Sequence, residues 1–177
     1  MIRLVDEALR SRFALHSGLA SPAVTLADPA VGTGTFMLGT LRRIAETVAA
    51  DEGPGAVPAA IDAVVRRLLA FEIQLGPFAV AQLRILAELS DLIGAAPTTP
   101  LRMFVTDTLG NTYIEQGWVP AILSPIAESR RRANEIKRQE PITAVIGNPP
   151  YKEKAKNRGG WVEAGSANSP EPPPLAA

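Results

Sequence analysis

The strongest constraint on the fold is a glycine turn that follows a short apolar run near the N-terminus. Residues 24–26 are Val, Thr and Leu, which favour a buried strand, and Pro29 then ends it because proline has no N–H for the ladder. Gly32 and Gly34 allow a sharp bend and leave room for a ligand, since neither has a Cβ atom. Between residues 35 and 50 aliphatic side chains recur three and four positions apart, which predicts a helix. A strand, a glycine turn and a helix in this order place nucleotide-like ligands at the carboxyl end of the strand.

Two better-known glycine motifs have a different spacing. The dinucleotide fingerprint Gly-x-Gly-x-x-Gly needs a glycine where Met37 stands, and the next glycine is Gly39. The Gly-Lys-Ser/Thr ending of a phosphate-binding loop is also absent from this turn. An ordinary strand-to-helix turn, with no ligand, is the remaining alternative.

The rest of the sequence alternates helical and extended patterns. Further strands are predicted at 68–73, 101–105 and 142–147, and further helices at 2–13, 58–67, 77–92 and 120–139. About four strands alternating with helices predict an α/β fold with a parallel sheet and right-handed crossovers. We expect one domain over residues 1–163 and a disordered proline-rich tail over 164–177. The charged run at 130–138 is predicted to be a solvated helix face.

Composition excludes several classes of chemistry. The sequence has no cysteine, which rules out disulfides and thiol nucleophiles, and its single histidine, His16, has no partner for a metal site. The net charge of zero is unlike that of a self-sufficient DNA-binding domain. No apolar run reaches the ~20 residues of a membrane span, and no leader is recognisable, so we expect a cytoplasmic protein with no membrane partner.

Acidic residues end the first three predicted strands. Asp28, Glu72 and Asp107 occupy corresponding positions, where a carboxylate is able to accept two hydroxyl hydrogen bonds from a ligand. Each of them alone could equally cap the following helix. Three in succession favour a shared ligand site at one edge of the sheet.

A rigid polar segment follows the fourth predicted strand. It reads Asn148-Pro149-Pro150-Tyr151, and consecutive prolines fix φ while they hold the preceding residue extended. The simplest interpretation is a stiff turn after a strand. The alternative is a site in which the oxygens of Asn148 and Pro149 are aimed at a substrate.

Together, the run DPAVGTGTF at 28–36 and the later NPPY at 148–151 resemble S-adenosylmethionine-dependent DNA adenine-N6 methyltransferases. The resemblance covers roughly residues 3–163. It is nearest to the methyltransferase region of large single-chain bacterial restriction-modification enzymes. It implies a Rossmann-like parallel sheet of the class I methyltransferase type, S-adenosylmethionine as cofactor and DNA as partner.

The resemblance also implies roles for individual residues at the cofactor. Asp28 and the glycine turn would surround its methionine part, Glu72 would hold the ribose hydroxyls, and Asp107 would accept from the adenine amine. A proline and an aromatic residue at the start of the next helix would line the adenine. The expected cofactor-binding residues are Asp28, Ala30, Gly32, Gly34, Thr35, Glu72, Ile73, Pro77, Phe78, Asp107, Thr108 and Leu109.

Catalysis, by the same resemblance, would belong to Asn148, Pro149, Pro150 and Tyr151. The side-chain oxygen of Asn148 and the carbonyl of Pro149 would accept the hydrogens of the target amine. Tyr151 would stack on a base flipped out of the duplex. The same four-residue motif occurs in enzymes that methylate a protein glutamine amide or an RNA guanine, so these substrates are alternatives.

The resemblance is incomplete at both ends. The sequence begins inside the helix that leads to the cofactor, and it stops soon after Tyr151, without the later strands of a seven-stranded sheet. We therefore expect a partial catalytic core whose missing segments come from another chain, or an inactive fragment that at most binds cofactor. The fourth strand would be an exposed apolar edge that promotes association.

Overall fold

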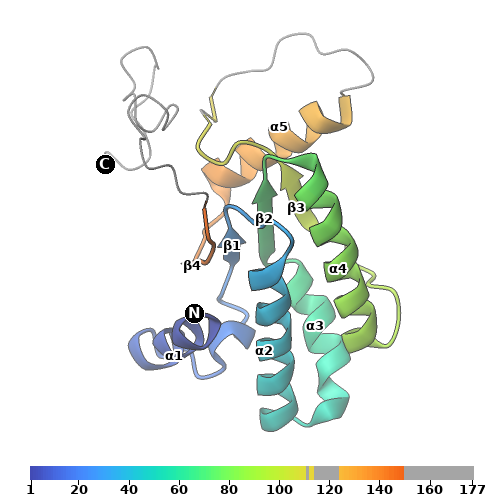
Figure 1. Ribbon diagram of the computed structural model, residues 1–177. Coiled ribbons are helices and arrows are strands. Elements are labelled where there is room, and N and C mark those ends of the chain that lie inside the picture. The colour runs from blue at the N-terminus through green and yellow to red at the C-terminus, as the bar shows by residue number, and fades with distance from the viewer. Residues whose placement is uncertain (111, 114–123, 150–177) are drawn as a thin grey trace.

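The computed structural model describes residues 1–110, 112–113 and 124–149. Its centre is a four-stranded sheet in the order β3-β2-β1-β4, in which all three pairings are parallel (Figure 1). The strands are β1 (Leu26–Asp28), β2 (Leu68–Glu72), β3 (Arg102–Val105) and β4 (Ala144–Val145). The prediction of an α/β, Rossmann-like parallel sheet is confirmed.

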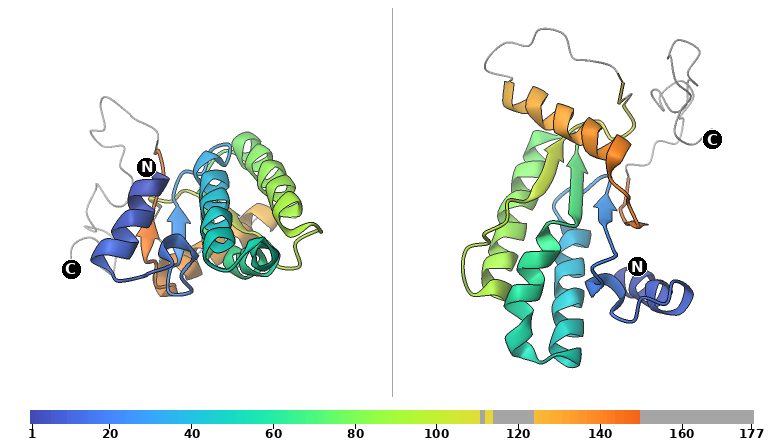
Figure 2. Two further views of the ribbon diagram at one scale, coloured as in Figure 1. Left: turned by 90° about the horizontal axis from the view of Figure 1, so that it is seen from below. Right: turned by 180° about the vertical axis from the view of Figure 1, so that it is seen from behind.

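Helices cover both faces of this sheet. The described helices are α1 (Ile2–Arg12), η1 (Gly18–Ala20), α2 (Thr35–Asp51), η2 (Pro54–Ala56), α3 (Val57–Val65), α4 (Leu75–Ile93) and α5 (Ser124–Gln139). The helices α2, α3 and α4 pack on one face and α5 crosses the other (Figures 1 and 2). Right-handed crossovers explain this division. The chain moves outward from β1 to β3 and then returns past β1 to β4, so α5 must lie on the opposite face.

Two apolar clusters fill the layers. The larger lies between the sheet and α2, α3 and α4, and its most buried members include Leu41, Ile61 and Leu89. The smaller lies under α5, where Phe71 and Phe104 stack with ring centroids 5.8 Å apart. Strand β2 supplies both clusters because alternate side chains point to opposite faces of a strand. A parallel sheet buried on both faces is the expected result.

Helix α1 is attached to α2 by a buried carboxylate. Asp6 accepts hydrogen bonds from the Arg43 guanidinium at 2.8 and 2.9 Å and from the main-chain N–H of Leu19 at 2.8 Å. Burial alone would raise the pKa of Asp6, but the Leu19 N–H, Arg43 and Arg10 outweigh it and hold the pKa below its usual value. Gly18 lies so close to this carboxylate that a Cβ atom there would collide with it. The network fixes the entry to β1.

The element boundaries differ from the sequence predictions at β1, at β4 and at the start of α4, and by one or two residues at the ends of other elements. Strand β1 (residues 26–28) begins at Leu26 and not at Val24 as predicted, because the N–H of Val24 closes a turn onto Ser21 at 3.1 Å. Strand β4 has two residues where 142–147 were predicted. Helix α4 begins at Leu75, which places Pro77 in its first turn, where the missing N–H costs no intrahelical hydrogen bond.

Some predictions fall outside the described residues. These are the start of the helix predicted at 120–139, the residues Pro150 and Tyr151, and the tail at 164–177. Among the helices that the structure does describe, none combines the length and the apolar character needed to cross a membrane.

Candidate ligand site at the carboxyl edge of the sheet

The strand order reverses between the neighbouring strands β1 and β4. From β1 the chain proceeds toward β2, whereas β4 is reached from the far side, so the connections leave the two strands in opposite directions. In open α/β sheets, ligands bind in the crevice at the carboxyl ends of two such strands. This switch point lies at the ends of β1 and β4, and the candidate site is there.

The glycine turn and the segment before Asn148 meet at this edge. The N–H of Ile146 donates to the Ala27 carbonyl at 2.9 Å, and β4 then runs past the end of β1. A Cβ atom on Gly147 would stand 2.8 Å from Oδ1 of Asp28 and 2.9 Å from Cδ of Pro29. Only a glycine fits this approach without displacement. The two motifs therefore lie beside each other on one edge of the sheet.

The turn itself requires its two glycines. Gly32 and Gly34 have φ values of +55° and +89°, in the left-handed region that side chains disfavour. Gly34 caps the N-terminus of α2, and a Cβ atom there would stand 3.5 Å from Ala81 of α4. Gly32 faces open space, because a Cβ atom would meet only the Ala30 carbonyl, at 4.0 Å. The left-handed backbone is therefore what requires glycine at position 34, and Gly32 in addition leaves the site open.

Asp28 is fully buried, with one carboxylate oxygen unused. Its Oδ1 accepts the Ala30 N–H at 3.1 Å, and its Oδ2 has no hydrogen-bond partner among the described residues. Burial raises the pKa of Asp28 to about 6; the Ala30 N–H opposes the rise, and the charge of Glu72 adds to it. A buried polar atom without a partner is costly, which points to a donor from a bound ligand.

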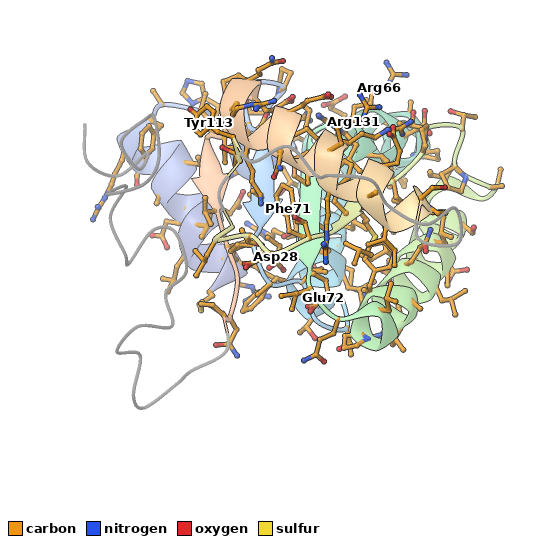
Figure 3. The ribbon with its side chains drawn as sticks, turned by 90° about the horizontal axis from the view of Figure 1, so that it is seen from above. Asp28, Arg66, Phe71, Glu72, Tyr113 and Arg131 are labelled. Carbon is orange, nitrogen blue, oxygen red and sulfur yellow. The ribbon has the colours of Figure 1, made fainter. Side chains whose placement is uncertain are left out.

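Glu72 fastens the glycine turn to the end of β2. Its Oε2 accepts the Gly32 N–H, and its Oε1 accepts those of Ile73 and Gln74, all at 2.9 Å. Figure 3, which looks onto this edge, shows Glu72 and Asp28 at the ends of the neighbouring strands β2 and β1. A carboxylate has about four acceptor positions, so about one is left for a ligand.

The loop after β3 closes the other side of the site. The hydroxyl of Thr108 donates to the Pro29 carbonyl at 2.6 Å, which joins this loop to the glycine turn. The N–H of Leu109 donates to Oδ1 of Asp107 at 3.0 Å. The structure thus gathers the loops that follow β1, β2 and β3 around one edge, as the acidic strand ends predicted.

The remaining predicted residues surround these loops. Pro77 and Phe78 lie half-buried in the first turn of α4, Ile73 is exposed at the end of β2, and Thr35 is exposed at the first position of α2. Asn148 and Pro149 are both exposed after β4. No group of three or more potential metal-ligating side chains occurs in the part of the chain that the structure describes.

Two basic residues at this edge were missed from the sequence. Arg84 of α4 donates to the Thr33 carbonyl at 2.7 Å and so holds the glycine turn. Lys137 of α5 donates to the Asp107 carbonyl at 2.8 Å. The prediction of a solvated face over 130–138 is right for Arg131, which is 64% exposed and pairs with Glu128, but wrong for Lys137. Lys137 lies on the side of α5 that faces the sheet, whereas Arg131 lies on the exposed side. The sequence prediction did not distinguish these two positions.

Fold and site together define a Rossmann-like α/β domain whose candidate ligand site lies at the β1/β4 switch point. No family model matches the sequence, and no curated protein matches it significantly.

Solved structures do match. One is a nuclease-deletion mutant of the Type ISP restriction-modification enzyme LlaGI in complex with a DNA substrate mimic; it is 29% identical, with a TM-score of 0.66, over 84% of this chain. The ATP-dependent Type ISP enzyme LlaBIII bound to DNA is 29% identical, with a TM-score of 0.68, over 86%. A DrdV–DNA complex is 27% identical, with a TM-score of 0.61, over 84%.

The matched region is a small part of those proteins. It spans 12% of the LlaGI chain, 10% of the LlaBIII chain and 13% of the DrdV chain. The chain described above therefore resembles one region of restriction-modification enzymes.

Proposed function

We propose that this chain is the catalytic core of an S-adenosylmethionine-dependent DNA methyltransferase that modifies the exocyclic amine of adenine. The observation that carries the proposal is the contact between Gly147 and Asp28, which brings the segment entering Asn148 against the glycine turn. A methyl donor on one side and an acceptor amine on the other need this proximity, because transfer requires the reacting atoms at contact distance and in line. The similarity to restriction-modification enzymes supports DNA as the substrate.

The residues at the edge suit the cofactor. The unpartnered Oδ2 of Asp28 would accept from the ammonium of its methionine part, and the open side of Gly32 would leave room for that part of the cofactor. The remaining acceptor position of Glu72 suits a ribose hydroxyl, and Asp107 suits the adenine amine. When bound, S-adenosylmethionine supplies a methyl group on a positively charged sulfur.

Asn148 and Pro149 would prepare the acceptor. An aromatic amine is a poor nucleophile because its lone pair is delocalised into the ring. Hydrogen bonds from its two hydrogens to the Asn148 side-chain oxygen and the Pro149 carbonyl favour a tetrahedral nitrogen, which localises the pair. The two prolines would restrict the positions of both oxygens, and Tyr151 would stack on the flipped base for ~1–3 kcal/mol. The nitrogen gains the methyl group and loses one hydrogen as a proton.

Calorimetric titration tests the cofactor assignment. We expect S-adenosylhomocysteine and S-adenosylmethionine to bind the chain weakly, and Glu72→Ala and Asp107→Ala each to lower the affinity about tenfold or more, as lost hydrogen bonds to charged groups do. Arg131→Ala, on the exposed side of α5, serves as the matched control and should bind normally. Absence of binding to the unaltered chain at millimolar ligand would contradict the assignment.

Methyl incorporation tests the substrate. We expect none into duplex DNA by the 177 residues alone, and transfer to adenine once they are joined to the segments that lie outside the matched region in a similar enzyme. Asn148→Ala should then abolish transfer and leave cofactor affinity unchanged. Transfer to a protein glutamine or an RNA guanine in place of DNA adenine would identify one of the alternative substrates and overturn the DNA assignment.

A further inference from the structure

The last turn of α5 holds the loop that follows β3. Lys137 donates from Nζ to the Asp107 carbonyl at 2.8 Å, and Arg138 donates from Nη1 to the Thr112 carbonyl at 3.0 Å. Helix α5 packs on the face of the sheet opposite α2, α3 and α4 (Figure 2). The loop is therefore held by α5, a helix that supplies none of the residues assigned to the cofactor.

Lys137 is half-buried, whereas the other basic residues of α5 are exposed. Its Nζ lies 5.9 Å from the centre of the Phe71 ring, so the amine is held over an aromatic face at the end of β2. Burial lowers the pKa of Lys137 to about 8, and the Asp107 carboxylate partly opposes this. An amine kept in such surroundings loses hydration, which its hydrogen bond to Asp107 and the ring face replace only in part.

The carbonyl that Lys137 holds belongs to Asp107, the residue proposed above to accept from the adenine amine of the cofactor. The Asp107 carbonyl also accepts the Gly110 N–H at 3.2 Å, and Oδ1 of Asp107 accepts the Leu109 N–H at 3.0 Å. The direction of the Asp107 carboxylate thus follows from the main chain of residues 107–110. That main chain is fixed to the rest of the protein by Lys137 on one side and by Thr108, through Pro29, on the other.

We propose that Lys137 is a positioning residue for base recognition: by fixing the main chain of Asp107, it holds the Asp107 carboxylate where it accepts a hydrogen bond from the exocyclic amine of the cofactor's adenine. This inference rests on the proposed function. Lys137 itself touches no ligand and acts through Asp107. Lys137 therefore contributes to the preference for a ligand whose purine carries the amine over a ligand that lacks it. This effect is distinct from any general effect on the stability of the fold.

The test compares two ligands that differ only in this amine. They are S-adenosylhomocysteine and the analogue whose purine carries hydrogen in place of the amine. The unaltered chain should bind the first about tenfold or more tightly than the second, as expected for a hydrogen bond to a carboxylate. Lys137→Met keeps the length and the packing on Phe71 but has no donor, so the preference should fall to less than about threefold. Lys137→Arg, which keeps a donor, should restore it.

Arg131→Met provides the matched control. Arg131 lies on the same helix, is 64% exposed and pairs with Glu128, so its loss should leave the preference unchanged. Thermal unfolding and circular dichroism show whether each variant is folded, and Lys137→Gln replaces Lys137→Met if the latter is not. Amide hydrogen exchange at Leu109 and Gly110 should become several-fold faster in Lys137→Met, which tests the anchor without a ligand.

The outcomes separate this inference from the proposed function. If Lys137→Met binds both ligands more weakly by the same factor, the role of Lys137 is only structural and the inference is wrong. Equal binding of both ligands by the unaltered chain refutes recognition by Asp107 but leaves cofactor binding intact. If the unaltered chain binds neither ligand, both proposals fail together.

Discussion

At the scale of single residues, the site is built from groups whose protonation depends on burial. Asp28 is the clearest case, because it has no exposed surface and one oxygen without a partner among the described residues. Its pKa is raised from 3.8 to about 6, with burial as the main cause. Without a bound cation, this carboxylate destabilises the folded protein at neutral pH.

The sign of the pH dependence follows directly. Between pH 4 and 6 the folded state binds more protons at Asp28 than the unfolded state, so the contribution of Asp28 to stability is complete below about pH 4 and is lost as the pH rises through about 6. We expect the free energy of unfolding to fall by up to about 3 kcal/mol over this range, relative to an Asp28→Asn variant in which the group does not titrate. Urea unfolding at a series of pH values measures the difference. Parallel curves for the two proteins would contradict it.

At the scale of elements, the close approach of β4 to β1 depends on a single missing Cβ atom. Gly147 lies against Asp28 and the ring of Pro29, at distances that no Cβ atom tolerates without a shift. The strands are joined by few hydrogen bonds, since β4 has only two residues. Crowding at this point should therefore move the Asn148 segment away from the glycine turn.

A pair of glycine variants tests this. Gly147→Ala should lower the free energy of unfolding by about 1–3 kcal/mol, the usual cost of overpacking a close contact. Gly55→Ala is the control, because a Cβ atom there has nothing within 4 Å, and it should change stability by less than about 1 kcal/mol. Chemical denaturation compares the two. Similar stabilities for both variants would show that β4 accommodates the added methyl group.

At the scale of the whole molecule, the sheet ends in an apolar edge strand. Strand β4 pairs only with β1 among the described strands, and Val145 is 63% exposed. Ile142, just before this strand, is 37% exposed. Unpaired edges of this kind template association with other strands, and in the similar enzymes this region is about a tenth of a much longer chain.

We therefore expect the chain to associate as its concentration rises, and Val145→Lys to suppress this because a charge on an edge strand opposes pairing. Sedimentation velocity over a range of concentrations measures the effect. Leu83→Lys is the matched control, since Leu83 is 69% exposed but lies on α4, away from the edge. A larger effect from the Leu83 variant would assign association to the helix surface instead.

The sequence by itself determined the kinds of element and their order. Helical spacing, the glycines at 32 and 34 and the prolines at 29 and 77 act locally, so the strand, turn and helix pattern was readable without the fold. The length of β4 could not be predicted from the sequence. An apolar run at 142–147 suits a strand, but pairing ended after Val145, where the chain passes Asp28.

The tertiary structure decided the order of the strands and the individual contacts between distant residues. The position of β4 beside β1 depends on the handedness of crossovers and on α5 taking the opposite face, and no local pattern encodes it. The hydrogen bond between Glu72 and Gly32 joins residues 40 positions apart, and the one between Lys137 and Asp107 joins residues 30 positions apart. Such contacts form only after the sheet has brought the strand ends together, because their partners are chosen by packing and not by neighbours in the chain.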